Sequence, residues 1–168
     1  MQPNIEIPQK EIIVPSNEII TGLHVINESI IERVYKEPEI VYGMKPREFE
    51  EFVAEIYEKL GYRVELTKAT RDGGKDIILY ADGPTGHNMF YVECKKYDKE
   101  NPVGVRLVRN LYGVVEAEKA TAGILVTSSS FTKDAREFAK DVYRRLTLYD
   151  YMELLSMVYS KNQKLFIV

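Results

Sequence analysis

Three charged residues near the middle of the chain, Asp76, Glu93 and Lys95, have the types and spacing that metal-assisted chemistry requires. Two carboxylates at one strand edge can hold a hard divalent cation such as Mg²⁺. Such an ion polarises a phosphate and generates hydroxide from bound water. A lysine on the same strand face can orient that water or offset negative charge in the transition state. The pattern D-x16-E-x-K therefore favours chemistry at a phosphate group.

A surface salt bridge on an exposed sheet face is the alternative interpretation of these residues. Glu-x-Lys triplets are common by chance, so the triplet alone favours that interpretation. The two glycines before Asp76, the aromatic residues before Glu93 and the hairpin spacing favour a functional site. Because side chains alternate along a strand, Glu93 and Lys95 should share one face, with Cys94 buried on the other.

The hydrophobic periodicity predicts the elements that must position these residues. Helices are expected over residues 27–36, 46–60, 101–119 and 151–159. A further helix should begin at a Thr132 cap and bury Phe138 and Val142. Strands are expected over residues 62–66, 76–81, 89–96, 122–129 and 146–150. The first three strands form an antiparallel run, with a turn at 70–74 and a hairpin loop at 82–88. The order predicts an α/β fold with a mixed central sheet flanked by helices.

Length and composition are those of one soluble globular domain: 168 residues, 45% hydrophobic and 29% charged. Residues 1–26, with three prolines within the first 15 positions, are expected to be an N-terminal arm. Residues 27–160 should form the domain and 161–168 a C-terminal tail. No apolar run is long enough to span a membrane, and the N-terminus does not resemble a secretory signal.

The cysteine and charge content narrow the functional classes further. A single cysteine fits a reducing cytoplasm. Two distant histidines without cysteine partners argue against zinc. The glycines before Lys75 lack the spacing of a phosphate loop, so no nucleotide cofactor is expected. The net charge of −3 argues weakly against strong nucleic-acid binding, although basic residues outnumber acidic ones after residue 60.

Four segments resemble the catalytic domain of Mrr-like restriction endonucleases, which belong to the PD-(D/E)xK nuclease superfamily. They are, in order, FEEFVAEIYEKLGYRVELT, RDGGKDIILYA, YVECKKY and VRNLYGVVEAEKATAGILVTSSSFTKDAREFA. The resemblance implies an α-β-β-β-α-β core and Mg²⁺-dependent cleavage of DNA phosphodiesters, with Mn²⁺ as a substitute. It makes Asp76 and Glu93 metal ligands, the Cys94 backbone carbonyl a further ligand, and Lys95 the catalytic lysine.

Three residues of this site can be compared further with the family pattern: two depart from it and one matches it. Lys75, not proline, precedes Asp76, although Mrr-like domains commonly have Gly-x-Asp, as Gly74-Lys75-Asp76 does. Many Mrr-like domains have Gln-x-Lys where this chain has Glu-x-Lys. A carboxylate binds Mg²⁺ better than an amide, so Glu93 strengthens the metal interpretation. Glu50, at the margin of the apolar stripe of its helix, matches the acidic residue that the family carries in its first helix. An ordinary solvated glutamate is the alternative.

Two groups of residues are candidates for contact with DNA phosphates. The candidates are Lys96, Arg106, Arg109, Asn110, Thr127 and Ser128. Lys96 and the α-helical trio at 106–110 offer charge and hydrogen bonds, and a solvated helix face is the alternative. Thr127 and Ser128 end a buried strand before a helix N-terminus, where hydroxyls suit a phosphate. Capping of the chain end is the alternative there.

The residues and the resemblance together favour a metal-dependent DNA endonuclease, of the type IV restriction kind that cuts modified DNA. A homodimer is expected, because cutting both strands calls for two active sites. A Holliday-junction resolvase is one alternative, although the acidic total counts against it. The other is a non-catalytic DNA-binding module built on a nuclease fold, which a degraded site would identify.

Overall fold

The computed structural model describes residues 29–67, 75–83 and 86–165. The expected N-terminal arm and the expected turn at 70–74 lie outside these ranges. Two features within the described residues differ from the expectation. The hairpin loop is shorter than expected, because its strands reach Gly83 and Gly86. The last helix continues to Leu165, so the boundary expected at residue 160 falls within it.

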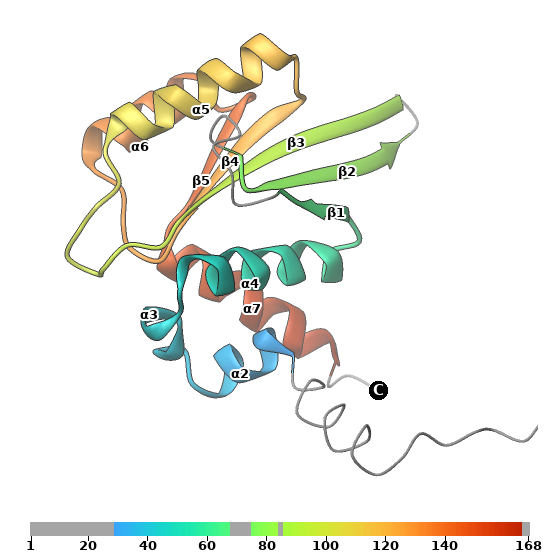
Figure 1. Cartoon of the computed structure of the whole chain (residues 1–168), viewed down its shortest axis with the longest axis vertical. Coiled ribbons are helices and arrows are strands. Elements are labelled where there is room, and N and C mark those ends of the chain that lie inside the picture. Colours follow the sequence, from blue (N-terminus) through green and yellow to red (C-terminus); the bar gives the residue numbers. More distant parts are fainter. Residues whose placement is uncertain (1–28, 68–74, 84–85, 166–168) are drawn as a thin grey trace, which may run out of the picture.

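One mixed sheet, with strands in the order β1-β2-β3-β4-β5, forms the centre of the molecule (Figure 1). Its strands are β1 Arg63–Leu66, β2 Ile77–Gly83, β3 Gly86–Lys95, β4 Ala122–Thr127 and β5 Leu146–Tyr149. The pairs β1–β2 and β2–β3 are antiparallel, whereas β3–β4 and β4–β5 are parallel. The carboxyl ends of β3, β4 and β5 therefore lie at the same edge of the sheet as the start of β2. This confirms the predicted α/β fold.

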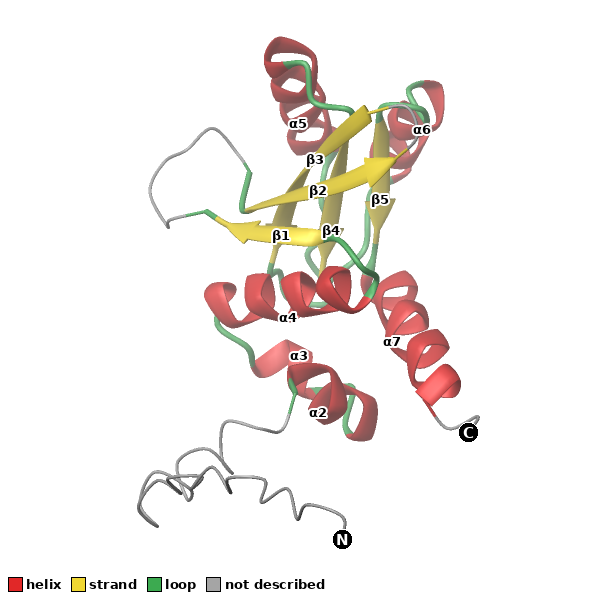
Figure 2. Ribbon diagram, turned by 90° about the vertical axis from the view of Figure 1, so that its right-hand side faces the viewer, coloured by secondary structure: helices red, strands yellow, loops and turns green. Residues whose placement is uncertain are grey.

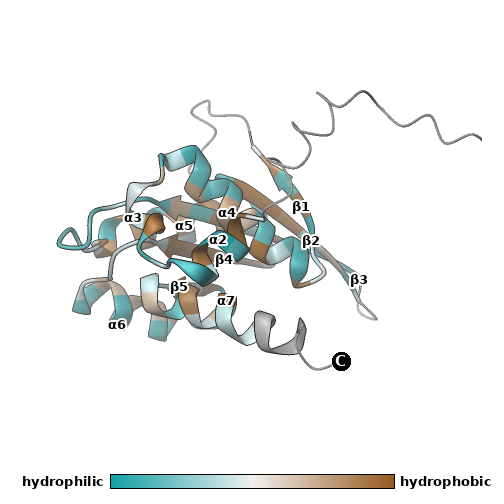
Figure 3. Cartoon of the chain, turned by 90° about the horizontal axis from the view of Figure 1, so that it is seen from below, coloured by the Kyte–Doolittle hydropathy of each residue, from teal (hydrophilic) through white to brown (hydrophobic). Residues whose placement is uncertain are grey.

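Helices cover both faces of the sheet (Figure 2). They are α2 Ile30–Lys36, α3 Ile40–Gly43, α4 Pro46–Lys59, α5 Val105–Glu118, α6 Lys133–Asp141 and α7 Tyr151–Leu165. The helices α5 and α6 lie on one face, and α4 and α7 lie on the other. The short helices α2 and α3 pack outside α4. Figure 3 shows hydrophobic colouring along the central strands and hydrophilic colouring on outer surfaces such as α6.

Two hydrophobic clusters, one on each face, hold these layers together. Val92 and Cys94 belong to the cluster beneath α4 and α7, whereas Tyr91 belongs to the cluster beneath α5 and α6. This confirms the predicted alternation along β3. The contact between α5 and β4 is close, because a Cβ at Gly123 would lie 2.8 Å from Val115 Cγ2.

Local sequence signals set several helix ends. Pro46 occupies the first turn of α4, where its missing N–H costs no hydrogen bond. Gly61, at φ +94°, follows that helix in a conformation that glycine adopts readily. The Thr132 hydroxyl accepts a hydrogen bond from the Ala135 N–H at 3.3 Å, as a helix cap does.

Two expectations about the helices are wrong. The four-residue helix α3 was not expected, because one turn has no detectable periodicity. Phe138 and Val142 are half-buried rather than buried. The reason is that the Phe138 ring packs edge-on against Tyr112 of α5, at 5.8 Å between centroids, rather than deep on the sheet.

Candidate active site

Asp76 stands immediately before β2, where the antiparallel ladder with β3 becomes irregular. Its N–H donates to the Val92 carbonyl at 2.8 Å. Its side-chain Oδ2 accepts a hydrogen bond from the Cys94 N–H at 2.7 Å. The carboxylate of Asp76 therefore lies beside the peptide that joins Glu93 to Cys94, and its direction is fixed by a backbone donor.

Glu93 is a buried carboxylate, only 4% exposed, on the neighbouring strand. Its Oε1 lies 2.7 Å from the Lys95 ammonium. Its Oε2 is buried and has no hydrogen-bond partner within the described part of the chain. Burial raises the pKa of Glu93 above its ordinary value, and the nearby charge of Asp76 raises it further against the opposing effect of Lys95. An unpaired buried carboxylate oxygen is costly, which indicates a missing partner.

Lys95 ends β3 with its side chain one-quarter exposed. Burial alone would lower the pKa of Lys95, but the hydrogen bond and the charge of Glu93 raise it above its ordinary value. The ammonium is therefore charged at neutral pH and has access to solvent. The surface salt bridge considered above does not describe this pair, because Glu93 is buried.

Thr127 and Ser128 hold the backbone just after the catalytic candidates. Both residues are fully buried. The Thr127 hydroxyl donates to the Lys95 carbonyl at 2.8 Å, and the Ser128 hydroxyl donates to the Tyr97 carbonyl at 2.7 Å. These side chains are not available to a DNA phosphate, so the structure corrects that expectation in favour of capping.

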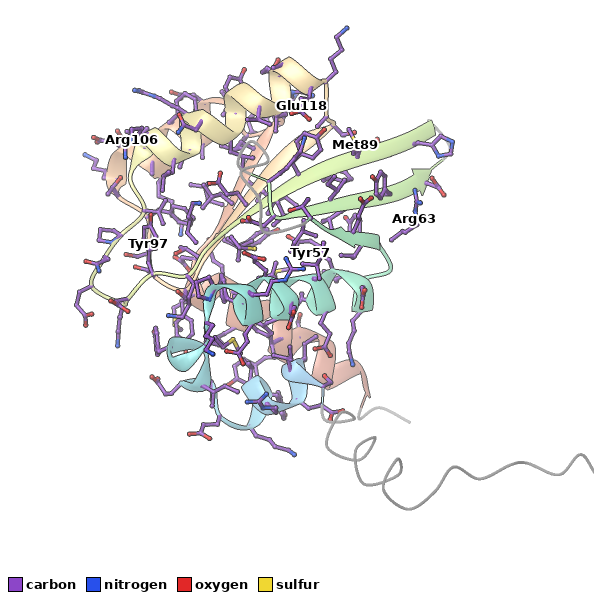
Figure 4. The ribbon with its side chains drawn as sticks, in the orientation of Figure 1. Tyr57, Arg63, Met89, Tyr97, Arg106 and Glu118 are labelled. Atoms are coloured by element: carbon purple, nitrogen blue, oxygen red, sulfur yellow. The ribbon has the colours of Figure 1, made fainter. Side chains whose placement is uncertain are left out.

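The remaining DNA-contact candidates lie on accessible surface. Arg106, Arg109 and Asn110 are exposed on the outer side of α5, and Lys96 is half-buried after β3. Figure 4 shows Arg106 at the end of α5 that follows the Tyr97 segment, with Glu118 at the opposite end. The Arg109 guanidinium lies 5.3 Å from the centroid of the Phe138 ring, which restrains it on this face.

Glu50 does not join the other two carboxylates. Its Oε2 accepts a hydrogen bond at 2.9 Å from Arg47, whose Nη1 also donates to the Thr67 carbonyl at 3.0 Å. Burial chiefly raises the pKa of the Cys94 thiol, and the charges of Asp76 and Glu50 raise it further, so Glu50 lies near this end of β3. The described residues contain no group of three His, Cys, Asp or Glu side chains that could hold a metal.

The donor set nevertheless fits a hard divalent cation. Asp76 and Glu93 supply carboxylate oxygens, one of them buried without a partner, and oxygen ligands are those that hard cations prefer. The sequence did not reveal Arg47, Thr67 or Glu118 as neighbours of this site. Their contacts join positions far apart in the chain, for which a single sequence gives no signal.

An antiparallel run of three strands that continues through a helix into a parallel strand, with Asp76, Glu93 and Lys95 at one edge, is the arrangement of the PD-(D/E)xK fold class. The model of the Mrr catalytic domain, described as a restriction endonuclease, matches residues 41–158. The chain belongs to this restriction endonuclease family, as its sequence predicted.

Two relatives show how much of a longer protein the match covers. The chain is 30% identical over 133 residues to the type IV methyl-directed restriction enzyme EcoKMrr of Escherichia coli K12, which spans 76% of this chain and 42% of that protein. It is 31% identical over 120 residues to the uncharacterized protein y4cE of Sinorhizobium fredii, with 71% and 31% covered. The chain thus spans less than half the length of either relative.

Two solved structures share the fold. The modification-dependent restriction endonuclease AspBHI matches with a TM-score of 0.58 and 24% identity, over 96% of this chain and 41% of that one. The restriction endonuclease MspJI, solved with a 27-mer oligonucleotide, matches with a TM-score of 0.58 and 16% identity, over 82% and 32%. Both likenesses confirm the restriction-endonuclease-like fold. Within the described residues, no helix could cross a bilayer.

Proposed function

We propose that this chain is the catalytic domain of a Mg²⁺-dependent DNA endonuclease that acts on modified DNA. The observation that carries the proposal is the buried, unpaired Oε2 of Glu93 beside the oriented carboxylate of Asp76. Membership of the restriction endonuclease family supports DNA as the substrate. Modified DNA is supported by the methyl-directed relative EcoKMrr and by the modification-dependent fold neighbour AspBHI.

Asp76 and Glu93 would hold the metal ion, together with the Cys94 carbonyl. When bound, a divalent ion supplies Lewis acidity toward the phosphate and lowers the pKa of water. The chain's own part is to hold these oxygens in place: the Cys94 N–H fixes Asp76, and Lys95 fixes Glu93. Mn²⁺ should replace Mg²⁺, because both are hard cations that accept oxygen ligands.

Lys95 would act on the reacting phosphate. Its ammonium is charged, partly exposed and held on a backbone that Thr127 fixes. From there it can donate hydrogen bonds to the attacking water or to an oxygen that gains negative charge in the transition state. Glu50, held by Arg47, is proposed to act at the margin of the site.

DNA would be held by side chains near this edge. Lys96, Arg106, Arg109 and Asn110 are proposed phosphate contacts, because they are accessible donors on one side of the molecule. A homodimer is proposed, since cutting both strands requires two active sites. The free, buried Cys94 thiol fits a reducing compartment such as the cytoplasm.

Plasmid nicking tests the proposal with modified, unmodified and branched DNA, in Mg²⁺ or Mn²⁺. Asp76→Ala and Lys95→Ala should each lower the nicking rate by about 100-fold or more. Lys133→Ala, a lysine 86% exposed on α6, is the control and should leave the rate unchanged. Cleavage that persists in both site variants would show that the residues are wrongly assigned. No cleavage of any DNA, with no Mn²⁺ binding by calorimetry, would favour a non-catalytic module.

A further inference from the structure

The residue before Asp76 is held by side chains from two other elements. The Lys75 ammonium pairs with Glu118, the last residue of α5, and lies 4.4 Å from the centroid of the Tyr91 ring of β3. The Tyr91 hydroxyl donates to the same Glu118 oxygen at 2.7 Å. The Lys75 side chain is only 17% exposed. We call Lys75, Tyr91 and Glu118 the lysine clamp.

The same stretch of backbone is held by Thr67, the residue that follows β1. The Thr67 hydroxyl donates to the carbonyls of Lys75 and Asp76, at 3.0 and 3.1 Å, and the Thr67 N–H donates to the Asp76 carbonyl at 2.9 Å. Thr67 in turn receives a hydrogen bond on its carbonyl from Arg47. The backbone of Lys75 and Asp76 is therefore held by Thr67 through two carbonyl oxygens, and the Lys75 side chain is held by the lysine clamp.

Fixing this peptide fixes the direction of the Asp76 carboxylate. Its Oδ2 reaches the Cys94 N–H at 2.7 Å only while the backbone at 75 and 76 keeps its present course. The named motif of the superfamily has proline at this position, whose ring restricts φ to about −65°. This chain has lysine there, so no proline ring restricts its backbone at that position.

We propose that Lys75 is a positioning residue, which through Glu118 and Tyr91 holds the peptide that aims the Asp76 carboxylate into the metal site. The proposal rests on the proposed function for its consequence in metal binding. The contact between Lys75 and Glu118 connects the start of β2 to the end of α5. The lysine clamp thereby restrains the backbone by an ion pair, whereas a proline restrains it through its ring.

The physical setting makes this ion pair stronger than an ordinary surface pair. Exposed pairs contribute little because water screens them. Here the Lys75 side chain is only 17% exposed, and its ammonium also faces an aromatic ring, which attracts cations. It lies at the carboxyl end of α5, where the helix dipole favours positive charge. Burial alone would lower the pKa of Lys75, but the hydrogen bond that its ammonium donates to Glu118 raises it.

A direct contact between Lys75 and DNA is the rival role, and four variants separate the two. Glu118→Gln and Lys75→Met break the lysine clamp from either side. Lys75→Pro removes the ammonium but restores a restraint on the backbone. Glu116→Gln is the matched control, because Glu116 lies on the same helix, pairs with Arg145 at 2.7 Å and is 45% exposed, against 42% for Glu118.

Three measurements on the full chain test whether Lys75 positions Asp76, rather than whether it stabilises the fold. Mn²⁺ affinity without DNA should fall by roughly tenfold in Glu118→Gln and Lys75→Met, as for other partners that orient metal ligands. It should stay at the wild-type value in Glu116→Gln and Lys75→Pro, and Glu118→Gln should have no effect in the Lys75→Pro background. Hydrogen exchange at the Asp76 amide should accelerate only in the two clamp-breaking variants. Binding of DNA in Ca²⁺ should not change in Glu118→Gln.

Two results would overturn the proposal. One is unchanged exchange at the Asp76 amide in both Glu118→Gln and Lys75→Met, which would mean that the clamp holds nothing. The other is Lys75→Pro behaving like Lys75→Met with weaker DNA binding, which would make Lys75 a DNA contact. The exchange measurement requires neither metal nor DNA. If the wild type binds no Mn²⁺, the proposed function fails, yet exchange still decides whether Lys75 positions Asp76.

Discussion

Two clusters of acids and bases in this molecule have similar composition but differ in how completely their oxygens are paired. In the first, Glu93 keeps a buried oxygen without a partner in the described part of the chain. In the second, Arg136 donates to Asp150 Oδ2 at 2.5 Å and to both carboxylate oxygens of Glu153, at 3.2 and 2.9 Å. The second cluster also caps α7, because the N–H of Glu153 donates to Asp150 Oδ1.

The pKa of the glutamate is shifted in opposite directions in the two clusters. Burial raises the pKa of Glu93, so its ionised form is disfavoured until a further positive charge arrives. Burial would also raise the pKa of Glu153, but hydrogen bonds from Arg136 and from the Asp150 backbone lower it below the ordinary value. A cluster whose carboxylates are hydrogen-bonded within it stabilises the fold. A cluster that leaves a buried oxygen without a partner can bind a ligand there.

Substitution of Glu93 should give the largest effect of the three, and it should lower the activity rather than the stability. Glu93→Ala removes the unpaired oxygen and is expected to slow plasmid nicking by about 100-fold or more. Glu93→Gln should be milder and should raise the metal concentration needed for half-maximal nicking, because an amide is a weaker ligand. Its free energy of unfolding, measured in urea, should stay within about 0.5 kcal/mol of wild type or rise, since a neutral group costs less to bury. A large loss of stability in Glu93→Gln would contradict the proposed difference between the two clusters.

Substitution of Arg136 should give the reverse result. Arg136→Met leaves two carboxylates facing each other without their shared cation, and we expect unfolding in urea to show a loss of about 2 kcal/mol. Nicking should continue at close to the wild-type rate below the unfolding transition. Lys140→Met, on the same helix, is the control. A strong loss of nicking in folded Arg136→Met would mean that this second cluster also serves the reaction.

The smallest expected effect is the pH dependence of that loss. The pKa of Glu153 is lowered in the folded state, so its contribution to stability is present above its unfolded value, near 4.5, and is lost as the pH falls through the folded value. The destabilisation by Arg136→Met should therefore be full at neutral pH and shrink at more acidic pH. Urea unfolding of both proteins across this range measures it. A constant difference would mean that packing of the arginine, not charge, holds α6 to α7.

Local patterns were sufficient to predict much of the fold and to place Asp76, Glu93 and Lys95 together at one edge of the sheet. The apolar period of α4, with Pro46 and Gly61 at its ends, depends on residues a few positions apart. The alternation that separates Glu93 from Cys94 is a property of any strand. The residue types and spacing of Asp76, Glu93 and Lys95 indicated one site, and the family motif agreed with them. Each of these signals is carried within one element or one hairpin, so packing did not have to be known.

Contacts between distant elements were not predictable. Lys75 and Glu118 are separated by 43 positions, and Arg47 and Thr67 by 20. Nothing in the local sequence distinguishes them from solvated charges until the sheet and helices are assembled. Thr127 and Ser128 illustrate the same difficulty, since a hydroxyl at a strand end suits a phosphate and a backbone carbonyl equally. Only burial decides between those partners.

The lysine clamp has a consequence for how such domains can diverge. A proline before the aspartate restrains only its own backbone, so the end of the helix after the third strand is then free to vary. Where lysine takes that place, the two positions depend on each other, and a change at one favours a compensating change at the other. Lineages with lysine at 75 should therefore keep an acidic residue at 118, whereas lineages with proline should show drift there.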